Sequence, residues 1–148
     1  MALPELARRF PFARFLKFCV VGGTGVVVNY GVYLPLTRWA HVLAEYSLVA
    51  SIAVSILTNF LLNEAWTFRD RRTGGTGGFV GRLGRFYLVS LGGAVIQWGV
   101  SVLGFRYLGI IDWLAVLVGI GIATAWNFLL NLIWTWNKSA GKPNAPAA

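Results

Sequence analysis

The side chains with the clearest capacity for chemistry are amides and indoles that recur in two copies of one motif. The first copy runs from Asn59 to Phe68, and the second runs from Asn127 to Trp136, 68 positions later. A carboxamide both donates and accepts hydrogen bonds, and an indole offers an N–H donor beside an apolar ring. Such groups suit a ligand that carries a sugar and a phosphate. The motif supplies them as Asn59, Asn63, Trp66, Asn127, Asn131 and Trp134.

The same offset extends backwards from the motif without a gap, so the chain contains an internal duplication. It aligns Arg14 with Arg82 and Lys17 with Arg85, and 16 of the positions from 14 to 68 are identical to their counterparts. Self-similarity at a fixed offset indicates that each copy is one structural unit. The chain 1–148 is therefore expected to be a single membrane domain, with repeat one at 14–68, a linker at 69–81 and repeat two at 82–136.

The composition indicates an integral membrane protein. Hydrophobic residues make up 57% of the sequence and charged residues only 12%. Charged side chains are missing from four intervals, 18–37, 46–63, 86–105 and 113–137, and about 20 apolar residues span the hydrocarbon core as a helix. An all-α fold of four transmembrane helices is predicted, arranged as two parallel, directly repeated helical hairpins.

Basic residues predict the orientation in the membrane. Of the 13 Lys and Arg residues, only Arg38 and Arg106 lie at the far ends of the hairpins. Basic residues favour the cytoplasmic side of short loops, so both termini of this cytoplasmic-membrane protein are expected to face the cytoplasm. The net charge of +8 is thus a topology signal. Nucleic acid is not an expected partner, because no soluble domain remains to carry a basic binding surface.

Helix geometry places several polar residues at one depth. The first helix starts near Lys17 and the second ends near Asn63, and Arg85 and Asn131 repeat that relation. Asn59 and Asn127 lie one turn deeper on the same helix faces. Asn29 lies about 18 Å from Lys17 along the first helix, since a helix rises about 1.5 Å per residue. Gln97 has the same relation to Arg85. The predicted substrate-binding set is Lys17, Asn29, Asn59, Asn63, Trp66, Arg85, Gln97, Asn127, Asn131 and Trp134.

The alternative for the asparagines is that they hold helices together, because interhelical amides in a membrane each contribute about 0.6 to 2 kcal/mol. For Asn59 and Asn127 taken alone, this packing role is favoured. Glu64 has Leu132 as its counterpart, so it breaks the symmetry between the repeats. Charge balance with Lys17 or Arg69 is its favoured role, and contact with sugar hydroxyls is the alternative.

Enzyme chemistry is not expected from this sequence. No hairpin contains paired carboxylates or a Ser-His-Asp set, so no catalytic residue is assigned. One cysteine, Cys19, and one histidine, His41, do not make a metal site. The glycine-rich stretch 74–78 is not followed by the lysine and the Ser or Thr of a P-loop, and it is expected to be a flexible linker. No cofactor is predicted.

Three further expectations concern packing and the chain ends. Ser51 and Ser55, with Gly119 and Ala123 as counterparts, have the small-residue spacing that lets two membrane helices approach closely. The first apolar run lacks a small-residue cleavage site, so the first helix is expected to be retained. Residues 1–13 are expected to lie on the inner leaflet, and the tail from Ala140 is expected to be disordered.

Residues 14–138 resemble the GtrA-like family of small four-helix membrane proteins. The resemblance is carried by the opening Arg14-Phe15-Leu16-Lys17-Phe18-Cys19-Val20-Val21-Gly22 and by the ending from Asn59 to Phe68. It implies translocation of a polyprenyl-phosphate-linked sugar for cell-surface polysaccharide or glycolipid synthesis. The alternative is a non-transporting partner that docks a glycosyltransferase in the membrane. Four helices offer little room to surround a whole headgroup, so a homodimer is a plausible assembly.

Overall fold

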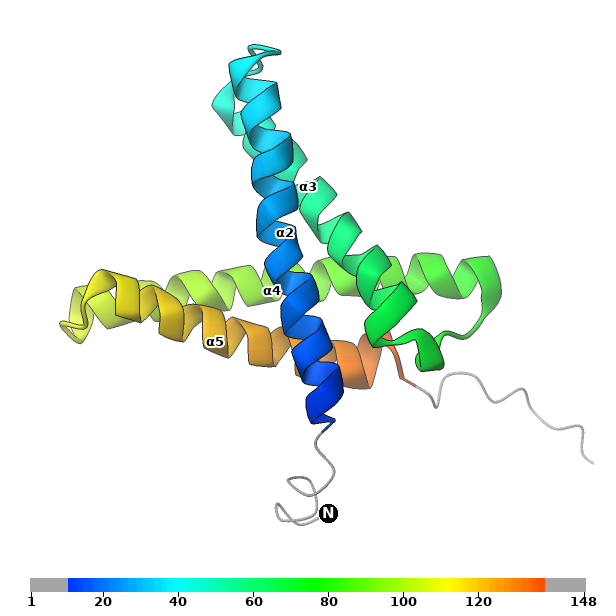
Figure 1. The fold of residues 1–148 in the computed structure, drawn as a ribbon. Helices are drawn as coiled ribbons and strands as arrows, with labels where there is room; N and C mark the ends of the chain where they lie inside the picture. The colour runs from blue at the N-terminus through cyan, green and yellow to red at the C-terminus, as the bar shows by residue number, and fades with distance from the viewer. Residues whose placement is uncertain (1–10, 138–148) are drawn as a thin grey trace, which may run out of the picture. The chain divides into compact units, whose positions relative to one another are not determined.

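The structure is a computed structural model that describes residues 11–137. The chain folds as two compact units, Met1–Arg69 and Asp70–Ala148, and each is a helical hairpin (Figure 1). The expectations for the first ten residues and for the tail from Ala140 lie outside the described residues.

The first hairpin consists of two long apolar helices. Helix α2 spans Phe12–Arg38, and α3 spans Ala44–Leu62. A π-helical turn, η1, continues α3 over Asn63–Thr67. A short 3-10 turn, η2, follows at Arg69–Arg71. The turn between α2 and α3 is short, so the two helices pack antiparallel along their lengths.

The second hairpin repeats this arrangement. Helix α4 spans Gly75–Tyr107, α5 spans Asp112–Leu130, and the π-helical turn η3 covers Asn131–Thr135. The bounds of α5 and η3 differ from those of α3 and η1 by 68 residues at both ends (112 − 44 = 68 and 135 − 67 = 68). The duplication inferred from the sequence is therefore reproduced in the backbone.

All four predicted membrane helices are present. The candidate spans are Phe12–Arg38, Ala44–Thr67, Gly75–Tyr107 and Asp112–Thr135, with mean hydropathies between 1.5 and 1.9. A helix satisfies its own backbone hydrogen bonds, which is the requirement for crossing hydrocarbon. The prediction of an all-α fold built from two hairpins is confirmed.

Burial follows the duplication residue by residue. Ten buried positions of the first repeat have a buried counterpart 68 residues later, whether the side chain is aromatic, small or polar. The two interiors are therefore alike and contain few large aliphatic side chains, although Glu64, Arg82, Ser101 and Gly104 are buried without a buried counterpart. The pairs are Phe18/Phe86, Val21/Val89, Gly25/Gly93, Ser47/Ala115, Ser51/Gly119, Ser55/Ala123, Phe60/Phe128, Asn63/Asn131, Thr67/Thr135 and Phe68/Trp136.

The small-residue face expected from the sequence is a close helix contact in both hairpins. The Ser55 hydroxyl donates to the Gly25 carbonyl at 2.7 Å. In the second hairpin, a Cβ added at Gly119 would lie 2.8 Å from the Gln97 carbonyl oxygen. Helices attract in lipid mainly through van der Waals packing, which small residues make possible by letting backbones approach.

The linker is shorter and more structured than the sequence indicates. Helix α4 begins at Gly75, so residues 75–81, assigned to the linker at 69–81, are helical. The Arg82 guanidinium donates to the Thr73 carbonyl, and Gly74 takes a left-handed φ of 80° at the start of the helix. Glycine disfavours helix formation, so the sequence alone does not predict a helix here. The contacts with the preceding loop stabilise the first turns of α4.

Candidate functional site

The two copies of the motif form the same unusual local structure, a π-helical turn at the end of an apolar helix. The Phe68 N–H donates to the Asn63 carbonyl at 2.8 Å, and the Trp136 N–H donates to the Asn131 carbonyl at 2.9 Å. These bonds span five residues instead of four. Isolated π turns are rare and occur frequently at functional sites, so their presence in both repeats marks this end of each hairpin.

Aromatic side chains hold each π turn against the first helix of its own hairpin. Phe18 meets Phe68 edge to face, with ring centroids 6.3 Å apart. Phe86 meets Trp136 in the same way at 5.8 Å. Phe68 and Trp136 are both fully buried. The turns are therefore fixed by packing, which keeps the polar side chains that they carry in a defined position.

The asparagine at the start of each π turn is buried and incompletely hydrogen-bonded. Asn63 is 1% exposed and Asn131 is 0% exposed. The Thr135 hydroxyl donates to the Asn131 Oδ1 at 2.6 Å. Within residues 11–137, Asn63 Oδ1, Asn131 Nδ2 and the Thr67 hydroxyl have no hydrogen-bond partner. A buried polar group without a partner costs about 1 to 3 kcal/mol, so each π turn presents unused hydrogen-bonding capacity.

One turn deeper, Asn59 and Asn127 pack against glycines of the neighbouring helix. A Cβ added at Gly25 would lie within 3.0 Å of the Asn59 carboxamide, and one added at Gly93 would lie within 2.8 Å of the Asn127 carboxamide. Both amides are half-buried. Within residues 11–137, the Oδ1 of each of these amides is also buried without a hydrogen-bond partner, so their contact with the neighbouring helix is one of close packing.

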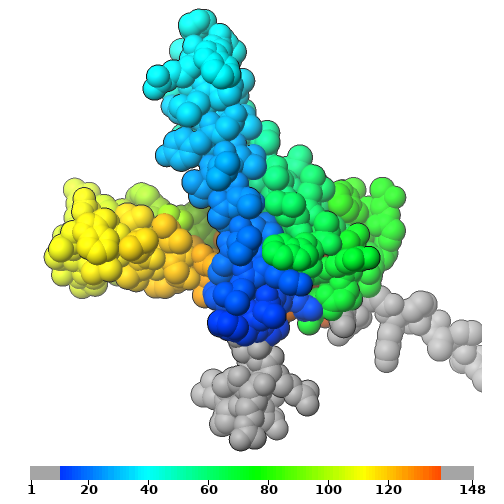
Figure 2. Space-filling view, viewed as in Figure 1, coloured from blue at the N-terminus to red at the C-terminus, as the bar shows by residue number. Residues whose placement is uncertain are grey.

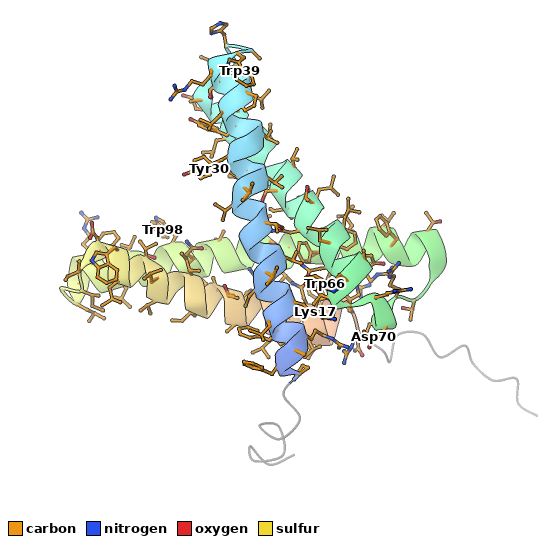
Figure 3. The ribbon with its side chains drawn as sticks, in the orientation of Figure 1. Lys17, Tyr30, Trp39, Trp66, Asp70 and Trp98 are labelled. Carbon is orange, nitrogen blue, oxygen red and sulfur yellow. The ribbon has the colours of Figure 1, made fainter. Side chains whose placement is uncertain are left out.

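The basic residue and the indole of the first repeat lie together. The Lys17 Nζ is 5.4 Å from the centroid of the Trp66 ring, and Figure 3 shows both residues near the same end of the hairpin. The expectation that α2 and the end of α3 share a depth there agrees with this contact. Trp66 is 48% exposed, so its ring remains available to a ligand.

The corresponding residues of the second repeat are arranged differently. The Arg85 Nε donates to the Gly81 carbonyl at 3.2 Å, in its own helix. Among the residues that the structure describes, no cation–π contact joins Arg85 to Trp134, which is 45% exposed. The two repeats therefore share their buried amides but differ in how their cations are held.

Asn29 and Gln97 lie apart from the π turns of their own hairpins, in the middle of α2 and α4. Both are half-buried. Gln97 lines a groove of about 420 Å³ with Trp98, Ser101 and Phe105, and its carbonyl accepts the Ser101 hydroxyl at 2.7 Å. No residue of a π turn lines that groove. The structure thus brings Lys17, Asn63 and Trp66 to one end of a hairpin, and does not bring Asn29 or Gln97 there.

Sequence reasoning missed one arginine and both threonines of the motif. The Arg71 guanidinium donates to the Leu132 carbonyl at 3.0 Å and to the Trp136 carbonyl at 3.3 Å, so it caps the second π turn. A cation suits the carbonyl end of a helix. Thr67 and Thr135 are buried beside the asparagines. The presence of threonine at the same position of both motif copies could have identified Thr67 and Thr135 from the sequence. Arg71 has no counterpart in the alignment of the repeats, so no such signal was available for it.

Four long apolar helices in two hairpins, each ending in a buried polar π turn, define a multi-pass α-helical membrane protein. Residues 17–136 match the family described as GtrA/DPMS, transmembrane domain. The chain belongs to that family, and the resemblance identified in the sequence is confirmed.

A relative with an assigned activity is a dolichol-phosphate mannosyltransferase of Pyrococcus furiosus. It is 35% identical over 127 residues, which are 83% of this chain and 34% of that protein. The chain therefore spans about a third of the length of this relative.

Proposed function

We propose that this protein translocates a polyprenyl-phosphate-linked sugar across the cytoplasmic membrane, for the synthesis of a cell-surface polysaccharide or glycolipid. The observation that carries the proposal is the buried, incompletely hydrogen-bonded asparagine at the same place in both π turns. Ionisable and polar groups inside a membrane are costly and tend to mark substrate pathways. A ligand with many hydroxyl groups supplies the missing partners.

The chemistry of the surrounding side chains supports this ligand class. Lys17 offers a cation for a phosphate, and Trp66 beside it offers an indole face and an N–H donor for a sugar. The relative from Pyrococcus furiosus is named for a dolichol phosphate and a mannose, which together make such a ligand. We assign headgroup contact to Lys17, Asn63 and Trp66 within the first hairpin. The corresponding residues within the second hairpin are Arg85, Asn131 and Trp134.

The remaining site residues take different roles in this proposal. Asn59 and Asn127 position the helices, because their amides pack on Gly25 and Gly93. Asn29 and Gln97 lie further along the path of the headgroup. Both termini are proposed to face the cytoplasm, which places the π turns in the inner leaflet. The chain itself is proposed to be non-catalytic.

A second candidate function is the docking of a glycosyltransferase in the membrane. It is favoured by the comparison, because a region similar to this chain occurs in a longer protein that is named a mannosyltransferase. The glycosyltransferase would then supply catalysis, and this membrane domain would hold it at the bilayer. In that case, the π turns would stabilise the fold and would not contact a headgroup.

The test is a liposome assay with the purified chain and one labelled polyprenyl-phosphate sugar. Asn63→Leu and Asn131→Leu are expected to lower the sugar moved per folded molecule at least about tenfold, since 1.4 kcal/mol corresponds to one decade. Asn59→Leu is the matched control. It is expected to reduce the amount of folded protein and to leave transport per folded molecule unchanged.

Two outcomes would overturn the transport proposal. The first is wild-type transport per folded molecule in both π-turn variants. The second is the absence of transport by the wild-type chain together with restored glycan synthesis in cells that express Asn63→Leu. The second result would support docking, because a docking role needs the fold and not the headgroup contacts.

A further inference from the structure

The end of the first hairpin remote from the π turn contains a pocket that neither the family nor the proposed function explains. Its volume is about 450 Å³, and it lies between the last turns of α2 and the first turn of α3. Tyr33, Thr37, Arg38 and His41 line it, together with Ala44 at the start of α3. The cyan atoms in Figure 2 mark this turn.

Two nitrogen-bearing side chains line the pocket without a partner. Within residues 11–137, neither the Arg38 guanidinium nor the His41 imidazole takes part in a hydrogen bond or an ion pair. Both are exposed. Glu45 is the nearest acidic residue in the sequence, and it is not among the residues that line the pocket. Arg38 presents a planar fork of donors and His41 presents another N–H, a combination suited to an oxyanion.

The duplication supplies an internal comparison for His41. Its backbone has a left-handed φ of 52°, and its counterpart Gly109 has a φ of 65°. The turn at this end of each hairpin thus requires one residue with a left-handed backbone conformation. Glycine meets that need without strain, whereas a side chain with a Cβ does not. The second repeat uses the unstrained residue, and the first repeat keeps an imidazole at the pocket.

The rest of the pocket also differs between the repeats. Thr37 is replaced by Phe105, which takes a polar group away. Ala44 is replaced by Asp112, whose Oδ1 accepts the Trp113 N–H at 2.8 Å. A carboxylate therefore occupies the first residue of α5, where α3 has Ala44, and the Glu45 carboxylate in the first turn of α3 does not line the pocket. Arg106 remains as the counterpart of Arg38, but the features around it no longer favour an anion.

The depth of the pocket matches the headgroup region of a bilayer. Arg38 lies 21 residues after Lys17, which corresponds to about 31 Å along a helix, close to the thickness of the hydrocarbon core. Trp39 is 79% exposed and stands at the end of the hairpin in Figure 3. Tryptophan is enriched at membrane interfaces. Lipid phosphates are found at the same depth.

We propose that this pocket binds a phosphate group through Arg38 and His41, at the membrane surface opposite the π turns. The ligand is a phosphate oxyanion, either in a lipid headgroup as a monoester or diester, or as free inorganic phosphate. The pocket and both side chains belong to one hairpin and lie at the end remote from the π turns. Phosphate binding there can therefore occur whether or not the protein transports a sugar. It gives the first repeat a function that the second repeat lacks.

The experiment measures phosphate binding to the full-length chain. The protein is placed in phosphatidylcholine nanodiscs that contain a small fraction of phosphatidic acid, and bound phosphatidic acid is counted by native mass spectrometry. Inorganic phosphate is added in a second arm as a competitor. Displacement by millimolar phosphate identifies free phosphate as a ligand, and failure to displace identifies a lipid headgroup.

Three variants test the assignment. Arg38→Gln and His41→Gly are each expected to weaken phosphatidic acid binding about tenfold, the effect of losing about 1.4 kcal/mol. Arg106→Gln, the matched change in the second repeat, is expected to bind as the wild type does. His41→Gly copies the second repeat and suits the left-handed backbone, so it tests the pocket even if Arg38→Gln folds poorly.

The proposal is overturned if His41→Gly binds phosphatidic acid as tightly as the wild type. It is also overturned if Arg106→Gln loses as much binding as Arg38→Gln, because the basic residues would then act only as general charges at the membrane surface. Failure of the liposome transport assay leaves this proposal unaffected, since the nanodisc measurement records binding alone.

Discussion

A single methyl group added at Gly119 should separate α4 from α5. A Cβ there would lie 2.6 Å from the Ser101 Oγ and 2.8 Å from the Gln97 carbonyl oxygen. The serine side chain can rotate, but the carbonyl belongs to the backbone of α4. An ordinary contact begins at 3.4 Å, so the helices must move apart by roughly 0.6 Å (3.4 − 2.8) at this crossing.

That displacement sets the expected energy. A gap of about 0.5 to 1 Å removes a quarter to a half of the dispersion attraction of each contact that it opens, and overpacking in well-packed interiors costs about 1 to 3 kcal/mol. Gly121→Ala is the matched control, because it lies in the same helix and a Cβ there meets nothing within 4 Å. The gain in helix propensity from Gly to Ala then cancels between the two variants.

The measurement is equilibrium unfolding in mixed micelles, with helix content recorded as the fraction of denaturing detergent is raised. Gly119→Ala is expected to be less stable than Gly121→Ala by about 1 to 3 kcal/mol. Adding Ser101→Ala should restore little of the loss, because the Gln97 carbonyl remains. Equal stability of Gly119→Ala and Gly121→Ala would refute the close contact between α4 and α5.

Three further predictions concern topology, capping and the outer turn. In a Cys19→Ser background, a cysteine at Ala44 should react with an impermeant reagent added to intact cells and one at Thr76 should not; the reverse pattern would invert the proposed orientation. Arg71→Gln should lower the free energy of unfolding by about 1 to 2 kcal/mol, because two carbonyls lose a charged donor, and unchanged unfolding would show that solvent replaces it. Gly109→Ala should cost about 1 to 2 kcal/mol at a φ of 65°, and a neutral result would mean that this turn relaxes to another conformation.

Much of the fold follows from the sequence because two signals are strong in it. The charge-free intervals locate the helices, since a charged side chain in hydrocarbon is costly. The offset of 68 residues then predicts that α5 copies α3. The small-residue spacing at Ser51 and Gly119 correctly predicted the contact face, because close approach in lipid depends on side-chain size.

The site was only partly predictable, for physical reasons that particular residues illustrate. The shift from α to π at Asn63 changes the hydrogen-bond register over a single turn of a continuous helix, and no residue type specifies it. The cap by Arg71 joins the linker to the end of the second hairpin, and linker residues have no pattern that reveals a distant partner. The helical start at Gly75 depends on tertiary contacts that override glycine's low helix propensity.

The shared spacing of the small-residue faces has a consequence for biogenesis. If α2 and α5 are both in the membrane before pairing is complete, α5 offers α2 a surface shaped like that of α3, so incorrect pairing within one chain is a hazard of the duplication. The short turns at 39–43 and 108–111 oppose it, because a short connection gives adjacent helices a high effective concentration for each other. The Ser55 hydroxyl bond to Gly25 adds discrimination, since Ala123 cannot replace it. Lengthening either turn would therefore be expected to slow assembly before it weakens the folded state.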